Sequence, residues 1–138
     1  MSAVSSEKEV VCRFNAEVIE QGNAESFAAL MGDGFINHAA PAGAPNGAES
    51  MWNTFENVLR PALSDLRVTI HEQLQEGDRV VSRKTISGRH TGPFMGVAAT
   101  GREVAISVID IVRVRDGRYI EHWGVNTLGA VIAALKQP

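Results

Sequence analysis

One acidic residue interrupts an apolar row in the last third of the sequence. Every second residue from Val104 to Val114 is apolar except Asp110, and alternate residues of a strand share one face. Burial would raise the pKa of this carboxyl group toward neutrality, where it could transfer protons. Asp110 is therefore the first candidate for acid–base catalysis, and the alternative is a structural ion pair with Arg83 or Arg113.

The dipeptide at 116–117, Asp-Gly, predicts how the following strand faces Asp110. It is typical of a two-residue β-turn, which would place Asp110 opposite Trp123 and bring Glu121 onto the same face. Glu121 is therefore the second candidate acid, unless nearby arginines neutralise it. The same register would put His122 on the opposite face, where we expect it to contact another sheet or subunit.

Two of the four histidines complete the set of predicted catalytic residues. His38 follows a short extended segment, from which it could reach the mouth of a cavity, and His90 lies at the end of a strand. Either could instead be a structural residue held by hydrogen bonds. His71 alternates with polar neighbours and is expected in solvent. No two histidines have the close spacing of a zinc site, so we predict no metal.

Helical spacing of apolar residues predicts three helices in the first half of the chain. The first follows a capping box formed by Ser6 and Glu9 and ends at Gly22. Asn23 is the predicted cap of a short second helix. The third helix breaks at Pro61, because the residue before a proline disfavours helical geometry.

The second half of the chain is predicted to be mainly strand, over residues 66–76, 79–90, 104–115 and 118–123, with a final helix or strand over 128–135. This order predicts an α+β fold. A curved antiparallel sheet would wrap around the three N-terminal helices as a cone-shaped α+β barrel with an internal cavity. The 138 residues contain no linker or repeat, so we predict a single domain over residues 1–138.

The predicted cavity is hydrophobic. The third helix and the loop from Gly92 to Gly101 should close it. Its expected substrate-binding walls are Trp52, Phe55, Phe94, Met95 and Trp123. Aromatic residues at such spacings could instead belong to an ordinary core.

Composition excludes several classes of function. The chain has 13 Lys and Arg against 16 Asp and Glu, a net charge of −3, so we expect no nucleic-acid partner. Motifs of serine hydrolases, dinucleotide enzymes and nucleotide triphosphatases are absent. The single cysteine, Cys12, fits a reducing compartment. Because the N-terminus carries no targeting pattern and no long apolar run occurs, we predict a cytoplasmic protein without a membrane partner.

Several segments resemble, in order and spacing, the SnoaL-like polyketide cyclase or ester cyclase family. They are residues 37–38, 76–81, 88–96, 99–102, 110–113 and 116–123. The resemblance implies a ketosteroid-isomerase-like cone, of the kind also called nuclear-transport-factor-two-like, often dimeric and with a cofactor-free active site. Family cyclases close a ring by intramolecular aldol condensation. By position, their pocket histidine falls at Asp110, their catalytic aspartate at Gly124, and an aspartate of ester-cyclase-like members at Asn126.

Three hypotheses for the function follow. In the first, a cofactor-free enzyme does acid–base chemistry on a hydrophobic cyclic or polyketide-type carbonyl compound. Asp110 would move a proton α to the carbonyl group, while His38, His90 or Asn126 would hold the oxygen. In the second, the protein hydroxylates a polyketide, which the lack of an acid at Gly124 favours. In the third, it is a noncatalytic small-molecule-binding or assembly module.

The face opposite Asp110 also carries apolar residues. Ile109 and Ile111 lie on that face, and Ile120 is expected to join them. An uncovered apolar face is typical of a subunit contact. We therefore predict a homodimer packed through the outer face of the sheet.

Overall fold

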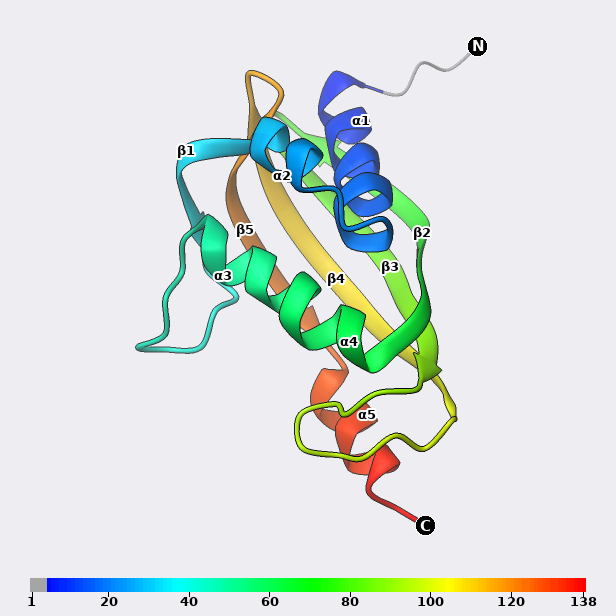
Figure 1. Cartoon of the computed structure of the whole chain (residues 1–138). Coiled ribbons are helices and arrows are strands. Elements are labelled where there is room, and N and C mark those ends of the chain that lie inside the picture. The colour runs from blue at the N-terminus through cyan, green and yellow to red at the C-terminus, as the bar shows by residue number, and fades with distance from the viewer. Residues whose placement is uncertain (1–4) are drawn as a thin grey trace.

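Helices precede the long strands in the computed structural model, which describes residues 5–138 (Figure 1). The helical segments are α1 (Ser6–Arg13), η1 (Phe14–Glu20), α2 (Ala24–Leu30), α3 (Ala48–Asn53), η2 (Thr54–Leu59), α4 (Arg60–Ala62) and α5 (Leu128–Leu135). The strands are β1 (Met31–Asn37), β2 (Leu63–Glu76), β3 (Arg79–His90), β4 (Glu103–Arg115) and β5 (Arg118–Asn126). The expectation about targeting rests partly on residues 1–4, which lie outside the described residues. The predicted α+β fold is confirmed.

Side chains cap the first two helices. The Ser5 hydroxyl accepts a hydrogen bond from the backbone N–H of Lys8. Ser5 is therefore the N-cap of α1, and the predicted capping box at Ser6 is wrong because Ser6 already belongs to the helix. Asn23 caps α2 as predicted, with its Oδ1 accepting from the N–H of Ser26.

Other boundaries differ by a few residues. The third helix continues through Pro61 to Ala62, because a proline is tolerated in the first turn of a helical segment. The second helix ends at Leu30, and Met31 begins β1. Residues 128–135 form a helix, the first of the two predicted alternatives.

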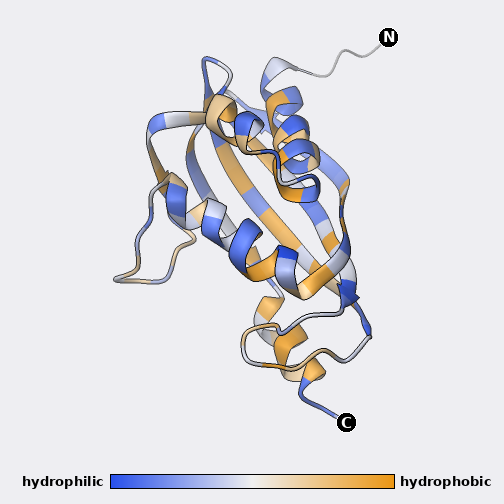
Figure 2. Cartoon of the chain, viewed as in Figure 1, coloured by the Kyte–Doolittle hydropathy of each residue, from blue (hydrophilic) through white to orange (hydrophobic). Residues whose placement is uncertain are grey.

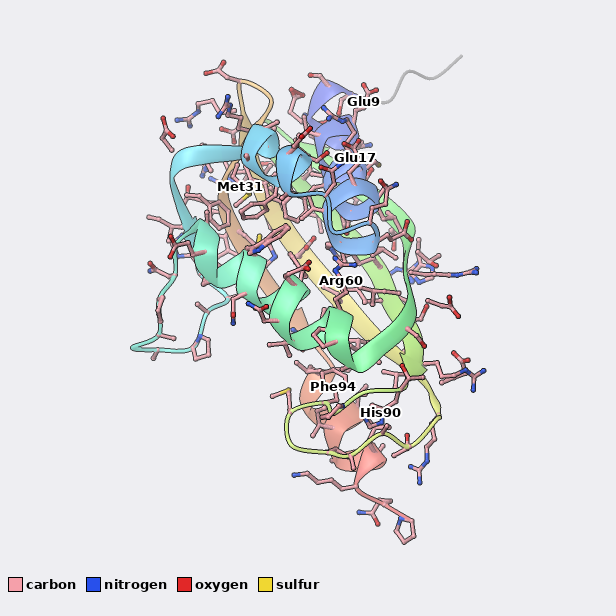
Figure 3. The ribbon with its side chains drawn as sticks, viewed as in Figure 1. Glu9, Glu17, Met31, Arg60, His90 and Phe94 are labelled. Carbon is pink, nitrogen blue, oxygen red and sulfur yellow. The ribbon has the colours of Figure 1, made fainter. Side chains whose placement is uncertain are left out.

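The first and third helices change from α-helical to π-helical geometry midway, where α1 continues as η1 and α3 as η2. In η1, Asn15 is only 2% exposed, and its Nδ2 donates to the carbonyl oxygen of Val11 at 2.8 Å. Arg60 ties the two helices together (Figure 3). Its guanidinium donates to three carbonyl oxygens at the end of η1, those of Val18, Ile19 and Glu20.

The strands form one sheet in the order β1-β5-β4-β3-β2. The predicted antiparallel meander β2-β3-β4-β5 is present, and β1 adds a parallel strand beside β5. The sheet is curved but not closed, since β1 and β2 remain its two edges. Helices α1 to α4 lie over one face, and α5 lies at one end beside the loop between β3 and β4 (Figure 1).

A β-bulge at Ile120 shifts the register between β4 and β5. The turn at 116–117 forms as predicted, with left-handed φ values of 53° and 76°. Beyond it the pairing changes by one residue, which leaves Ile120 without a partner on β4. The pairs are Arg115 with Arg118, Val114 with Tyr119, and then Arg113 with Glu121.

The bulge reverses the faces that we predicted for β5. Asp110 is paired with Gly124 rather than with Trp123. His122 consequently shares the inner face with Asp110, while Glu121 and Trp123 lie on the outer face. The predicted register is wrong because a turn type fixes the register only until the first bulge.

Buried apolar side chains form two clusters, and Figure 2 shows the alternation along the strands that builds them. One cluster, under α1 and α2, includes Phe14, Val80, Val112 and Tyr119. The other, near α4 and α5, includes Leu59, Ile86, Phe94 and Ile106. On the inner faces of β3 and β4, the buried residues between the two clusters are polar: Ser82, Lys84 and Asp110.

Candidate active site

A cavity of about 630 Å³ lies over this polar layer. Its walls come from the inner face of the sheet, from α3 and η2, and from the loop after β1. Most of the wall is apolar, including Met51, Trp52, Phe55, Leu59, Ile106 and Leu128. The volume is in the range of ordinary small-molecule sites.

Three ionisable side chains meet at one wall of the cavity. The Nζ atom of Lys84 lies 3.2 Å from Oδ2 of Asp110, and Nε2 of His122 lies 3.3 Å from the same oxygen. The Lys84 and Asp110 side chains are 6% and 5% exposed, and that of His122 is 15% exposed. We call these three residues the polar triad.

An amide holds each end of the polar triad. Lys84 donates from Nζ to Oδ1 of Asn15 in η1 at 2.7 Å. His122 Nδ1 lies 2.8 Å from Oδ1 of Asn37 at the end of β1. The triad is thus fixed from a helix on one side and from the edge strand on the other.

The carboxyl group of Asp110 is ionised. Burial alone would raise its pKa, but the nearby Lys84 ammonium and the hydrogen bond to His122 outweigh burial and hold the pKa below the ordinary aspartate value. The predicted rise toward neutrality is therefore wrong, since that prediction considered burial without these partners. An ionised carboxylate can act as a base, not as an acid.

One oxygen of this carboxylate has unused hydrogen-bonding capacity. Oδ2 serves both Lys84 and His122, whereas the buried Oδ1 has no hydrogen-bond partner among residues 5–138. A buried carboxylate oxygen without a donor is costly. Because Asp110 lines the cavity, its carboxylate is a candidate to accept a proton from a bound molecule.

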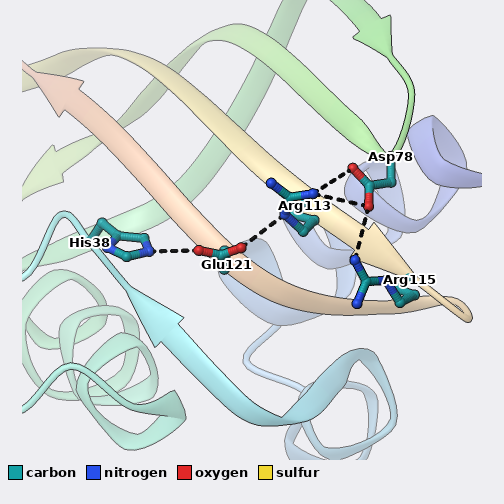
Figure 4. A network of polar contacts seen from close by, with 5 residues as sticks. All are labelled: His38, Asp78, Arg113, Arg115 and Glu121. Carbon is teal, nitrogen blue, oxygen red and sulfur yellow. Dashed lines mark hydrogen bonds and ion pairs between the residues drawn. The ribbon is translucent and has the colours of Figure 1, made fainter.

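Two predicted catalytic residues, His38 and Glu121, lie outside the cavity. His38 Nε2 is 2.8 Å from Oε2 of Glu121, and Oε1 of the same carboxylate accepts a hydrogen bond from Nε of Arg113 (Figure 4). The His38 and Arg113 hydrogen bonds lower the pKa of Glu121. The ring of His38 stacks on Trp123 with centroids 4.8 Å apart. These contacts, on the outer face of the sheet, explain why Trp123 does not line the cavity either.

His90 is a core residue. It is fully buried, and its Nδ1 accepts from the backbone N–H of Thr100 at 3.2 Å. Its ring packs edge-on to Phe94, which is also fully buried (Figure 3). Met95 is 59% exposed. His90, Phe94 and Met95 do not line the cavity, because the loop between β3 and β4 packs at the end of the sheet near α5 instead of over the cavity.

The remaining predicted binding residues, Trp52, Phe55 and Asn126, do line the cavity. Two members of the polar triad, Lys84 and His122, are absent from our predicted site. Lys84 could have been found, because it continues the alternating inner row of β3. His122 could not, since only the bulge brings it inside.

No metal cluster or membrane helix is found in the part of the chain that the structure describes. Within residues 5–138, no three His, Cys, Asp or Glu side chains are grouped so that they could hold a metal ion. Within the same residues, no helix is long and apolar enough to cross a bilayer.

Comparisons with known proteins agree with this geometry. A family model described as SnoaL-like polyketide cyclase matches residues 9–135. A Jannaschia sp. CCS1 protein named as a candidate SnoaL-like polyketide cyclase is 28% identical, with a TM-score of 0.81 over 100% of this chain and 99% of that chain. IdmH from Streptomyces antibioticus, named as a candidate polyketide cyclase, is 25% identical, with a TM-score of 0.80 over 95% and 98%.

A further solved structure carries a different name. AclR from Streptomyces galilaeus, named as a candidate hydroxylase, is 24% identical, with a TM-score of 0.83 over 99% of this chain and 89% of that chain. At this identity the likeness concerns the fold alone. No curated protein matches the chain.

Proposed function

Because the chain belongs to the SnoaL-like polyketide cyclase family, we propose that it is an enzyme that moves a proton on a hydrophobic carbonyl compound held in the cavity. The observation that carries the proposal is that ionised Asp110 lines the cavity and that its buried Oδ1 has no hydrogen-bond partner among residues 5–138. Asp110 would take a proton from the carbon next to the carbonyl group. His122, which contacts Oδ2, would orient the carboxylate.

The surroundings of Asp110 support this role. Apolar walls exclude water, so solvent does not compete with a bound carbon acid for the carboxylate. The cavity volume of about 630 Å³ suits a compound of two or three fused rings. No cofactor is needed for such a proton transfer.

Gly124 links the proposal to the family pattern. The resemblance puts the family's catalytic aspartate at this position, which pairs directly with Asp110 across the two strands. A Cβ atom at Gly124 would lie 3.3 Å from Cβ of Asp110 and 3.2 Å from Cε1 of His122. A glycine therefore leaves room for these two side chains. Asp110 supplies a carboxylate from the facing strand, which weakens the case for hydroxylation based on Gly124.

Deuterium exchange tests the proposal without a known substrate. Bicyclic ketones such as 2-tetralone are incubated with the protein in D₂O, and incorporation at the α-carbon is followed by NMR. We expect the wild-type protein to exceed the buffer rate and Asp110→Asn to lose about 10²-fold.

Glu121→Gln is the matched control, because it removes a carboxylate from the outer face of the same strand pair and should exchange like the wild type. Equal losses in both variants would contradict the assignment of Asp110. Ketone binding without any exchange across a panel of ketones would favour the noncatalytic binding module instead.

A further inference from the structure

Lys84 has hydrogen-bonding capacity that its protein partners do not use. Its ammonium group has three N–H donors. Among residues 5–138, its acceptors are Oδ1 of Asn15 at 2.7 Å and Oδ2 of Asp110 at 3.2 Å. At least one N–H is therefore left, and the side chain lines the cavity. A buried cation with a free donor is a binding group for an oxygen atom of a ligand.

We propose that Lys84 binds the ligand oxygen on which negative charge develops, so that the cavity selects compounds that form an enolate or a phenolate. This inference rests on the proposed function, whose base is Asp110. The ammonium group of Lys84 and the carboxylate of Asp110 are 3.2 Å apart, and both residues line the same cavity. A carbonyl compound likewise has a hydrogen-bond acceptor, its oxygen, close to a proton that can be removed, the one on the neighbouring carbon.

The reaction step balances within these groups. Oδ1 of Asp110 takes the proton from the α-carbon, the C–H electron pair becomes the new C=C bond, and the carbonyl π electrons move to oxygen. The negative charge passes from Asp110 to the enolate oxygen. Because Lys84 lies next to both, its ion pair with Asp110 is replaced by an ion pair with the enolate, and the net charge of the cavity does not change.

The other predicted holders of this oxygen are less suitable. His38 and His90 do not line the cavity. Asn126 does, and its Oδ1 accepts from the backbone N–H of Leu128 at 2.9 Å, so its Nδ2 could donate, but only as a neutral group. Lys84 carries a full positive charge, and its side chain is only 6% exposed. A charge attracts an opposite charge more strongly where water is excluded.

Binding of an ionisable naphthol tests Lys84 directly. The probe is 4-nitro-1-naphthol, whose absorbance distinguishes its neutral and ionised forms, and its methyl ether is the control that cannot ionise. In Asp110→Asn, Lys84 loses its anionic partner, so naphtholate should bind at least about tenfold more tightly than to the wild type. The double variant Asp110→Asn/Lys84→Met should lose about tenfold or more of that affinity.

The double variant leaves no buried charge without a partner, which favours folding. Circular dichroism verifies that it folds, and Lys84→Gln replaces Lys84→Met if it does not. The methyl ether should bind both variants alike. Equally tight naphtholate binding with and without Lys84 would overturn the inference.

The exchange assay separates this result from the proposed function. If exchange depends on Asp110 but naphtholate binds equally well without Lys84, the inference about Lys84 is overturned and the proposed function stands. Naphtholate binding that requires Lys84, without exchange of any ketone, supports Lys84 as the oxygen-binding group and overturns the proposed function.

Discussion

Lys84 and His122 contact the same oxygen of Asp110, and this sharing decides how the carboxylate responds to pH. Breaking a buried ion pair from one side leaves the other charge without a partner. Asp110 was expected to be either catalytic or an arginine's partner. The structure instead places it in the cavity and pairs it with a lysine and a histidine. Stability and activity at this position therefore have to be measured separately.

Replacing Asp110 should destabilise the protein at neutral pH. Asp110→Asn leaves the Lys84 ammonium without its anionic partner and should lower the free energy of unfolding by about 3 kcal/mol. Urea unfolding at pH 7 measures this loss. Glu121→Gln changes a partly exposed group of ion pairs, in which Arg113 keeps Asp78 as a partner, and should cost less, about 1 kcal/mol. Unchanged stability in Asp110→Asn would mean that the ion pair contributes nothing.

The same carboxylate should make stability depend on acid pH. The pKa of Asp110 is lower in the folded protein than in the unfolded chain, so its contribution is complete above the ordinary aspartate pKa of about 4. It is lost as the pH falls through the lower, folded value. Between pH 7 and pH 3 the wild type should therefore lose more stability than Asp110→Asn. If the free energies of unfolding of the two proteins fell by equal amounts between pH 7 and pH 3, this expectation would be contradicted.

At the scale of elements, the bulge at Ile120 determines which side chains of β5 face the cavity. Deleting Ile120 should remove the bulge and leave the pairs Val114–Tyr119 and Arg113–Glu121 directly next to each other, so that His122 stays on the inner face with Asp110. We expect the deletion variant to keep α-proton exchange in the NMR assay, and urea unfolding measures what the bulge contributes to stability.

The matched control is Ile120→Ala, which keeps the number of residues and hence the register. It should fold and retain exchange. A deletion variant that folds but has lost exchange would contradict this expectation.

The bulge also marks where inference from sequence ends. Alternation predicts Asp110 on the inner face, and turn residues predict the hairpin at 116–117, because both signals are local. The side of His122 depends on one unpaired residue, Ile120, which no local pattern identifies. Lys84 belongs to a readable inner row, yet a lysine is expected in solvent unless its partners are known. Its partners, Asn15 and Asp110, come from distant elements.

At the scale of the whole molecule, the helices cover only one face of the sheet (Figure 1). The other face carries Ile109 and Val125, which pair across β4 and β5 and are 49% and 70% exposed. Beside them, Ile111 pairs with Trp123. Such a patch is typical of a protein interface, so the homodimer remains our prediction.

Sedimentation at micromolar protein concentration tests the predicted homodimer. The wild type should have the mass of a dimer, and Ile109→Glu should be a monomer because it buries a charge in the contact. Met95→Glu is the matched control, since Met95 is equally exposed but lies in the loop between β3 and β4. A monomeric wild type would contradict the prediction.

The position of β1 has a consequence for synthesis on the ribosome. β1 is made early, but its partner strand is β5, near the C-terminus. The contact between Asn37 and His122 therefore joins two segments that leave the ribosome at very different times. Until β5 has left the exit tunnel, the loop after β1 has no strand to anchor it. The wall that holds His122 is thus completed after helices α1 to α4 and the other strands, and a nascent chain cannot bind a ligand with the finished cavity before β5 has been made.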